Sequence, residues 1–330
     1  MTLANRLRYA NRPRYAGRLN AFRMGLPGRA TVEELIIRAA SVEGLDAADL
    51  NFPDHFADHE PAQLARVMED HGIVLNGLAM RYYTDPGFRL GAFSNPDPVV
   101  RRAAVDLTKR GMDALALMGG QVMTLWMGQD GVDYAFQGDY ARMWDDSLAC
   151  IAEVCDHNPE LDVALEYKPN EPRAFSLMPD IATNLLALRE LGRGNTGITL
   201  DFCHVLFAGE IPAQSAQLAG RYSRILGVHL NDGYGKRDDG LMVGSVHPVQ
   251  TLELFVELDR QGFDGVIYFD TFPDHGGLDP VAEARVNVMM ADRLRRIAAG
   301  LKDDPDLVAA RTRQDAAGVL RAVAGRLYQG

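Results

Sequence analysis

Short apolar runs alternate with longer amphipathic stretches along most of this chain, and this alternation limits the possible folds more than any other feature. An apolar run followed by a stretch of helical period recurs eight times, which predicts parallel strands that are each followed by a helix. The expected strands are 19–24, 47–52, 73–80, 122–127, 162–167, 197–201, 225–230 and 266–270. The expected helices are 31–43, 61–71, 97–118, 139–156, 179–192, 212–222, 248–261 and 279–299. We therefore expect a single (β/α)8 barrel over residues 19–302, a size that suits one large barrel.

Two further segments flank the predicted barrel. Residues 1–18 are an arm rich in arginine, and residues 303–330, rich in Ala and Arg, predict an additional helix. We expect the arm to contact an acidic surface of a neighbouring subunit or of a small partner chain. A frayed end and a transit peptide are the alternatives for the arm. The arginines that precede the first acidic residue, Glu33, are Arg6, Arg8, Arg12, Arg14, Arg18, Arg23 and Arg29.

Charge and composition exclude several classes of protein. The net charge of −11 argues against binding to nucleic acid or to an anionic membrane. No apolar run approaches the ~20 residues of a membrane span, and no signal-peptide core follows Met1. The cysteines Cys150, Cys155 and Cys203 form no even-numbered framework, so we expect a reducing, cytoplasmic setting. Cys203 is expected to be a buried small residue, not a nucleophile.

The end of the fifth predicted strand carries both a carboxylate and an ammonium group. Val163, Ala164 and Leu165 form the buried run, and Glu166 and Lys168 follow on the same face. The prolines that come next cannot donate to a ladder, so the strand ends here. In barrels of this type the chemistry takes place at the carboxyl ends of the strands, although a plain ion pair is the alternative.

Three more predicted strands end in potential metal ligands. Neighbouring strands of a barrel bring their carboxyl ends together, and carboxylates packed against an imidazole would repel one another without a cation between them. Oxygen-rich ligands with one imidazole suit Mn²⁺, Mg²⁺ or Co²⁺. The predicted ligands are Glu166, Asp201, His229 and Asp270.

A second group of potential ligands lies close to the first in the sequence. His204 follows Asp201 by three residues, and Asp238 and Asp239 lie in the loop after His229. Asp201 could bridge two ions, with the other three residues completing a second site, so one or two ions are expected. A solvated loop is the alternative for the acidic pair.

Other residues are predicted around the substrate. Trp126, at the end of the fourth strand, is expected to form an apolar wall against a sugar ring, with burial in the core as the alternative. His55, after the second strand, is a candidate for proton transfer, although a surface histidine is the ordinary outcome. Asn231, two residues after His229, and His247, at the start of a helix, are assigned to substrate binding.

The motifs over roughly residues 70–275 resemble the xylose isomerase-like TIM barrel superfamily. The run from Glu166 to Arg173, Glu-Tyr-Lys-Pro-Asn-Glu-Pro-Arg, is very similar to the strand-five motif of xylose isomerases, and Leu125–Gly131 is similar to their strand-four end. The resemblance implies Glu166, Asp201, His229 and Asp270 as ligands of one ion. It implies Asp201, His204, Asp238 and Asp239 for a second ion, and Lys168 as a donor to a substrate oxygen.

The chain also departs from that family. Xylose isomerases have a carboxylate at the position of His229, whereas rhamnose isomerases have a histidine there. Gly240 stands where a second-metal aspartate is expected, and the catalytic histidine of the second strand is matched only loosely by His55. The long C-terminal extension of xylose isomerases is mostly absent.

The resemblance implies a metal-dependent isomerase that interconverts an aldose and a ketose of an unphosphorylated sugar, with Mn²⁺ as the expected ion. Lys168, His204, Glu166 and His55 are the expected catalytic residues. The large subunit of a C-glycoside deglycosidase, which cleaves 3-oxo-glucosides with one metal and a small partner, is one alternative. A ketose 3-epimerase is another, and a non-catalytic protein that binds metal or sugar is the rival from a different class. A homo-oligomer is expected in each enzyme case.

Overall fold

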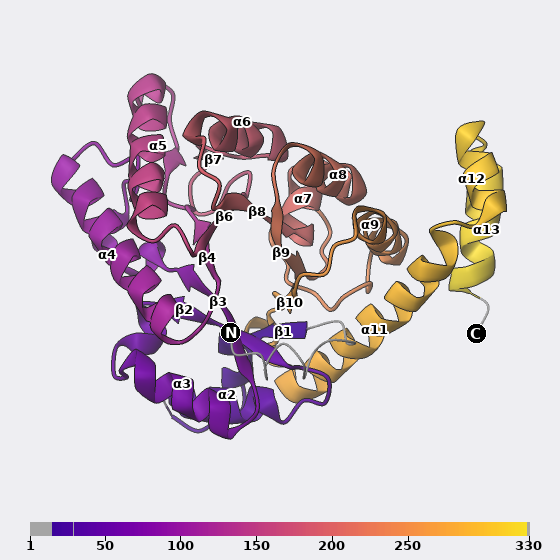
Figure 1. Cartoon of the computed structure of the whole chain (residues 1–330), viewed down its shortest axis with the longest axis horizontal. Helices are drawn as coiled ribbons and strands as arrows, with labels where there is room; N and C mark the ends of the chain where they lie inside the picture. The colour runs from indigo at the N-terminus through magenta and orange to yellow at the C-terminus, as the bar shows by residue number, and fades with distance from the viewer. Residues whose placement is uncertain (1–14, 29, 329–330) are drawn as a thin grey trace.

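The computed structural model describes residues 15–28 and 30–328 of the chain, and its centre is a closed barrel of parallel strands. The strand order around the barrel is β1-β10-β9-β8-β6-β4-β3-β2. Figure 1 shows the strands in the middle with the helices around them. The predicted (β/α)8 fold is thus confirmed. The strands are β1 (Tyr15–Arg18), β2 (Ala47–Phe52), β3 (Val74–Met80), β4 (Val122–Trp126), β6 (Asp162–Glu166), β8 (Thr196–Asp201), β9 (Ile225–Leu230) and β10 (Ile267–Phe269).

The helices that cover the barrel begin and end close to the predicted positions. Local capping explains several of these boundaries. At the start of α2, Thr31 Oγ1 accepts a hydrogen bond from the backbone N of Glu34, and the Glu34 carboxylate accepts one from the backbone N of Thr31. At the start of α4, the Asp97 side chain accepts a hydrogen bond from the backbone N of Val99. The covering helices are α2 (Val32–Ala40), α3 (Pro61–Asp70), α4 (Pro98–Leu117), α5 (Tyr140–His157), α6 (Ile181–Leu191), α8 (Pro212–Tyr222), α9 (Pro248–Gln261) and α11 (Pro280–Leu301).

The first strand lies earlier than predicted. The prediction of a strand over residues 19–24 is wrong, because Leu19–Arg23 forms the 3-10 helix η1 and β1 occupies Tyr15–Arg18. β1 closes the barrel by pairing with β10 on one side and β2 on the other. Residues 15–18 therefore belong to the barrel and not to the arm. The rest of the predicted arm, with Arg6, Arg8, Arg12 and Arg14, lies outside the described residues, as does Arg29.

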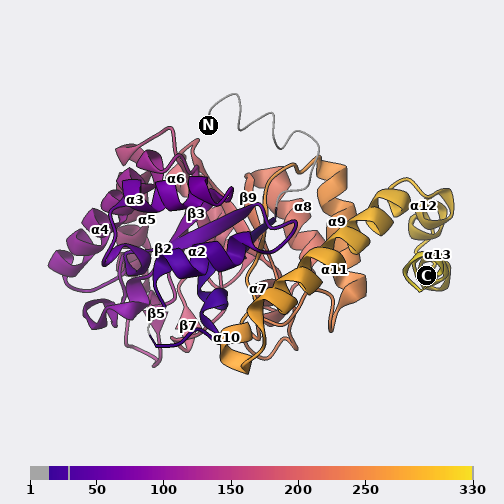
Figure 2. The same ribbon diagram turned by 90° about the horizontal axis from the view of Figure 1, so that it is seen from below.

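The C-terminal tail contains two helices where one was predicted, α12 (Pro305–Thr312) and α13 (Ala316–Leu327). The chain turns between them at Gln314, whose φ of 54° is left-handed, and Asp315 caps α13. α12 buries Leu307 and Ala310, whereas α13 has no fully buried side chain. Figures 1 and 2 show both helices standing to one side of the barrel, beyond the end of α11.

Short elements after the strands shape the mouth of the barrel. The antiparallel pair β5 (Gly131–Val132) and β7 (Phe175–Ser176) ties the loop after β4 to the loop after β6. The remaining short elements are the helices α7 (Phe202–Phe207) and α10 (Pro273–Gly276) and the 3-10 helices η2 (Asp54–Phe56), η3 (Tyr82–Thr84) and η4 (Pro86–Phe88).

No helix in the described part of the chain combines the length and the apolar character that a membrane span requires.

Alternation along the strands decides which side chains reach the mouth. In β8, Ile198 and Leu200 are fully buried in the main apolar core, and Asp201 ends the strand on the opposite face. In β9, Val228 and Leu230 lie in the same core, and His229 between them faces the barrel interior. The apolar residues therefore hold the strands against the helices, while the residues between them form the site.

Deletion of residues 1–18 is predicted to destroy the fold, because it removes the strand that closes the barrel and the buried side chains of Tyr15 and Ala16. The loss of one buried aromatic residue alone costs about 3–5 kcal/mol. We expect the truncated chain to lose its cooperative unfolding transition in urea. Deletion of residues 1–14 is the matched control, since it spares β1. Equal urea midpoints for the two truncated chains would show that β1 is dispensable.

Candidate metal and sugar site

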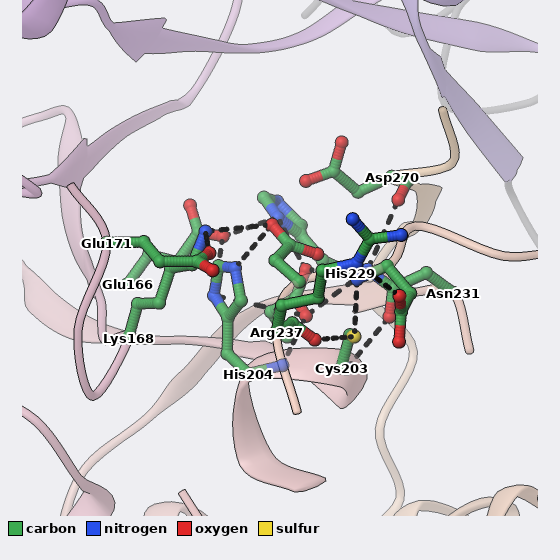
Figure 3. A network of polar contacts seen from close by, with 12 residues as sticks. Glu166, Lys168, Glu171, Cys203, His204, His229, Asn231, Arg237 and Asp270 are labelled. Carbon is green, nitrogen blue, oxygen red and sulfur yellow. Dashed lines mark hydrogen bonds and ion pairs between the residues drawn. The ribbon is translucent and has the colours of Figure 1, made fainter. Parts of the chain in front are cut away.

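Four side chains at the ends of adjacent strands converge at the mouth of the barrel. Glu166 and Asp201 are the last residues of β6 and β8, His229 lies in β9 opposite Asp201, and Asp270 directly follows β10. One potential ligand atom from each of the four lies within 4.8 Å of those from the others. Figure 3 shows Glu166, His229 and Asp270 turned toward one another. We call these four residues the strand-end cluster.

The charges of the strand-end cluster compensate one another only in part. His229 Nδ1 lies 3.2 Å from Glu166 Oε1. Burial alone would lower the pKa of His229, but the carboxylates of Glu166, Asp270 and Asp201 raise it to about 10. Burial also raises the pKa of the Asp201 and Asp270 carboxyls above the ordinary range. Without a cation, the cluster therefore retains protons at neutral pH.

A second polar group lies directly beside the strand-end cluster. The Asp238 carboxylate accepts from Lys168 Nζ at 3.1 Å, and the same oxygen lies 3.1 Å from His204 Nε2. Lys168 also lies 2.9 Å from Glu171. Burial opposes the ionisation of Asp238, but His204 and Lys168 hold its pKa well below the ordinary range. Figure 3 shows Lys168, His204 and Glu171 on the Glu166 side of the cluster.

The donor atoms of the strand-end cluster fit one divalent cation. Among the described residues, it is the one group of His, Cys, Asp and Glu side chains that meets the geometry of a metal site. His204 Nδ1 and Asp238 Oδ1, at its edge, are buried without a hydrogen-bond partner in the described part of the chain, which is costly for polar atoms. His204 Nδ1 is 3.5 Å from Glu166 Oε1, so it borders the cluster.

Asn231 orients the strand-end cluster from behind. Its amide nitrogen lies 3.2 Å from Asp201 Oδ2 and donates to the backbone oxygen of Asp270, and its amide oxygen accepts from the backbone N of Cys203. The residue is completely buried. Asn231 was predicted to bind substrate. The structure instead places it beneath the ligands, and it does not line the cavity. Cys203 is buried and forms no disulfide within the described part of the chain, and its burial agrees with the sequence interpretation.

Besides Asn231, three predicted site residues do not line the cavity. Asp239 accepts hydrogen bonds from the backbone N of Tyr234 and from Arg237 Nε, so both of its carboxylate oxygens have partners outside the cavity lining. His247 pairs with the buried carboxylate of Asp232 at 2.9 Å, at the start of α9.

His55 is the third of these residues, and it is locked in place beneath the mouth. Its ring accepts from the backbone N of Asn51 and bonds the side chain of Asn20, and burial lowers its pKa to about 3. A neutral, fully bonded imidazole of this kind holds η2 against β2. Sequence spacing placed all three residues near the mouth, but the direction of each side chain is set by a local partner.

A cavity of about 400 Å³ opens in front of the strand-end cluster. Aromatic rings form part of its wall: Tyr83 meets Trp126 edge-on at 4.9 Å, and Lys168 Nζ lies 5.3 Å from the Trp126 ring. Trp126 thus lines the cavity, and its contact with a sugar ring stays a prediction. The sequence interpretation missed several lining residues, namely Arg18, Arg81, Tyr83, Tyr268 and Phe272.

Comparisons with known proteins agree with this architecture. The family model described as xylose isomerase-like TIM barrel matches residues 37–294. The xylose isomerase of Thermus thermophilus is 26% identical over 267 residues, which cover 77% of this chain and 68% of that protein.

Solved structures of similar shape include a D-tagatose 3-epimerase-like protein, with a TM-score of 0.70 and 14% identity over 86% of this chain and 98% of that one. A structure of L-ribulose 3-epimerase has a TM-score of 0.69 and 16% identity, and covers 89% of this chain and 99% of that one. At these identities the likeness shows the shared fold. The family match covers most of the chain and confirms the resemblance found in the motifs. The chain therefore belongs to the xylose isomerase-like TIM barrel family and is an enzyme of this superfamily.

Proposed function

We propose that this protein is a divalent-metal-dependent isomerase that interconverts the aldose and ketose forms of an unphosphorylated sugar. The observation that carries the proposal is the strand-end cluster, which adjoins the ammonium group of Lys168 at one wall of a cavity of about 400 Å³. This volume is in the range of small-molecule sites. The similarity to a xylose isomerase supports the same class of reaction.

One Mn²⁺ ion, or Mg²⁺ or Co²⁺ in its place, is the proposed cofactor. Glu166, Asp201, His229 and Asp270 would hold it, since three carboxylates and one imidazole suit these ions. Such an ion supplies Lewis-acid polarisation of the sugar carbonyl and its neighbouring hydroxyl. We propose one ion and not two, because Asp239 is engaged elsewhere and His204 bonds Asp238.

Lys168 is the proposed donor to a substrate oxygen. Burial alone would lower the pKa of this ammonium group, but Asp238 and Glu171 raise it, so the group stays charged. Its position over the Trp126 ring directs it along the aromatic wall. A fixed cation of this kind stabilises negative charge that develops on an oxygen during the reaction.

His204 and Asp238 are proposed to move a proton between the two sugar oxygens. Asp238 Oδ2 fixes the imidazole through Nε2, which leaves Nδ1 next to Glu166 at the edge of the cluster. The pKa of His204 rises to about 9, since Asp201 and Asp238 outweigh the effect of burial. The reaction moves one hydrogen between neighbouring carbons and one proton between their oxygens, so it needs no further reactant.

One observation favours a second candidate, the large subunit of a C-glycoside deglycosidase. The described residues offer one metal cluster, and this elimination needs one cation. A base would take the proton next to the 3-oxo group, and the aglycone carbon would leave with the bonding electrons and accept a proton. His204 would be that base in its deprotonated form, which its raised pKa places above neutral pH.

Metal content separates the roles of neighbouring residues. Asp201→Asn should lower Mn²⁺ affinity by roughly 100-fold or more, because a direct ligand matters at least as much as its supporting shell. His204→Ala should keep one ion per chain but lose turnover. Asp239→Asn is the matched control and should keep both the ion and the turnover. Calorimetric titration with Mn²⁺ counts the ions, and an assay of aldose–ketose exchange measures the turnover. A second ion lost on His204→Ala would contradict the one-ion proposal.

The affinity for the cation should depend on pH. Ligands must lose their protons to bind a metal, and the raised pKa values of His229, Asp201 and Asp270 mean that protons occupy the cluster at neutral pH. Mn²⁺ affinity should therefore rise between pH 6 and pH 8, roughly tenfold per pH unit for each proton displaced. Calorimetry in two buffers of different ionisation enthalpy should also report proton release. An affinity that stays flat over this range would argue against the cluster as the binding site.

The reaction itself can be followed by proton NMR in D₂O with the Mn²⁺-loaded protein and a panel of aldoses, ketoses and a 3-oxo-C-glucoside. The isomerase proposal predicts aldose–ketose exchange, with kcat reduced roughly 10²–10³-fold in Lys168→Met. Transfer of hydride leaves the sugar free of solvent deuterium. Epimerised ketose or a released aglycone in place of aldose–ketose exchange would overturn the isomerase assignment.

A further inference from the structure

We propose that the cavity contains an anion subsite at Arg81 and that the substrate is an acidic sugar, one whose far end carries a carboxylate. The inference rests on the proposed function for the end of the sugar that meets the strand-end cluster. It adds a recognition element on the opposite wall, which none of the motifs in the sequence pointed to.

Arg81 lies across the barrel from the centre of the strand-end cluster. It directly follows β3, and β3 is four strands from β9 in either direction around the closed barrel. Arg81 and His229 both line the same cavity. A small linear or cyclic sugar between them would therefore present one end to the cluster and the other to Arg81.

Arg81 is the cavity cation whose charge the described residues leave unpaired. The other arginine and the lysine of the wall have carboxylate partners: Arg18 lies 2.8 Å from Asp274, and Lys168 bonds Asp238 and Glu171. Within the described part of the chain, the Arg81 side chain makes no hydrogen bond or ion pair.

The unpaired charge of Arg81 is also partly buried. Its Nε is removed from solvent without a partner among the described residues, and its guanidinium group packs 4.6 Å from the centre of the Tyr83 ring. Burying a donor of a charged group without an acceptor costs free energy, and an arriving anion would remove this cost. The side chain is thus held in place in advance for a negatively charged ligand.

The chemistry of the wall favours a carboxylate over a phosphate. A planar guanidinium forms two parallel hydrogen bonds with a planar carboxylate, and here a single guanidinium is available without a companion cation. Tyr83 and Trp126 line the same cavity and give its wall an apolar surface for the carbon skeleton of a sugar. Recognition at both ends would fix which carbons lie next to the cluster, so Arg81 sets specificity and does not take part in bond making.

The experiment compares neutral and acidic sugars on the Mn²⁺-loaded full chain by calorimetry. The probes are D-glucose, D-glucuronate and D-glucose 6-phosphate, which differ mainly at one end. We expect glucuronate to bind most tightly. Arg81→Met keeps the length of the side chain without its charge, and should weaken glucuronate binding roughly 10- to 100-fold while leaving glucose binding within twofold.

Controls separate this inference from the proposed function. Arg221→Met is the matched control, since this exposed arginine also packs over a tyrosine, Tyr222, but does not line the cavity. It should leave every affinity unchanged. Mn²⁺ titration of each variant reports on the strand-end cluster by itself. If the protein bound no Mn²⁺, the proposed function would be wrong, but the effect of Arg81→Met on glucuronate binding could still be measured. Equal binding of glucose and glucuronate, an equal loss of both in Arg81→Met, or tightest binding of the phosphate would overturn the inference.

Discussion

Electrostatic repulsion among three carboxylates, two buried and one partly buried, is the constraint on which the rest of this site depends. Ligand atoms of Glu166, Asp201 and Asp270 lie within 4.8 Å of His229; Glu166 and Asp201 are buried, and the Asp270 side chain is 17% exposed. Their neighbours relieve part of the repulsion: Asn231 donates to Asp201, and Arg18 Nε lies 3.6 Å from Asp270. Protons or a cation must supply the remainder. This need for positive charge is the physical basis for a metal site.

The barrel makes such a cluster possible because it fixes the backbone while the mouth stays polar. Val228 and Leu230 anchor β9 in the core on both sides of His229, and Ile198 and Leu200 do the same for the strand that ends in Asp201. Apolar packing outside the site thus offsets the unfavourable free energy of placing like charges together. The same division allows one wall of the cavity to hold the cluster while the opposite wall carries Arg81.

Sequence patterns predicted most of the fold because periodicity and capping are local. They failed at the first strand, since Leu19–Arg23 has an apolar content that suits a strand but forms η1, whereas the short β1 is recognised only by its pairing with β10 and β2. The strand-end cluster was predictable because strand order brings such residues together. Asp239 and His247 were not, since their directions depend on Arg237 and Asp232, partners that spacing does not reveal. Arg81 was missed because an unpaired charge is visible only when all its neighbours are known.

The most direct test of this account is the position of the metal. Crystals of the full chain soaked in Mn²⁺ should show, by anomalous scattering, one peak per chain between Glu166, Asp201, His229 and Asp270, with ligand distances of about 2.0–2.4 Å. A further soak in a large excess of Mg²⁺, which has almost no anomalous signal, should remove the peak by competition. A Mn²⁺ peak at another position, or none at the cluster under saturating Mn²⁺, would contradict the central claim.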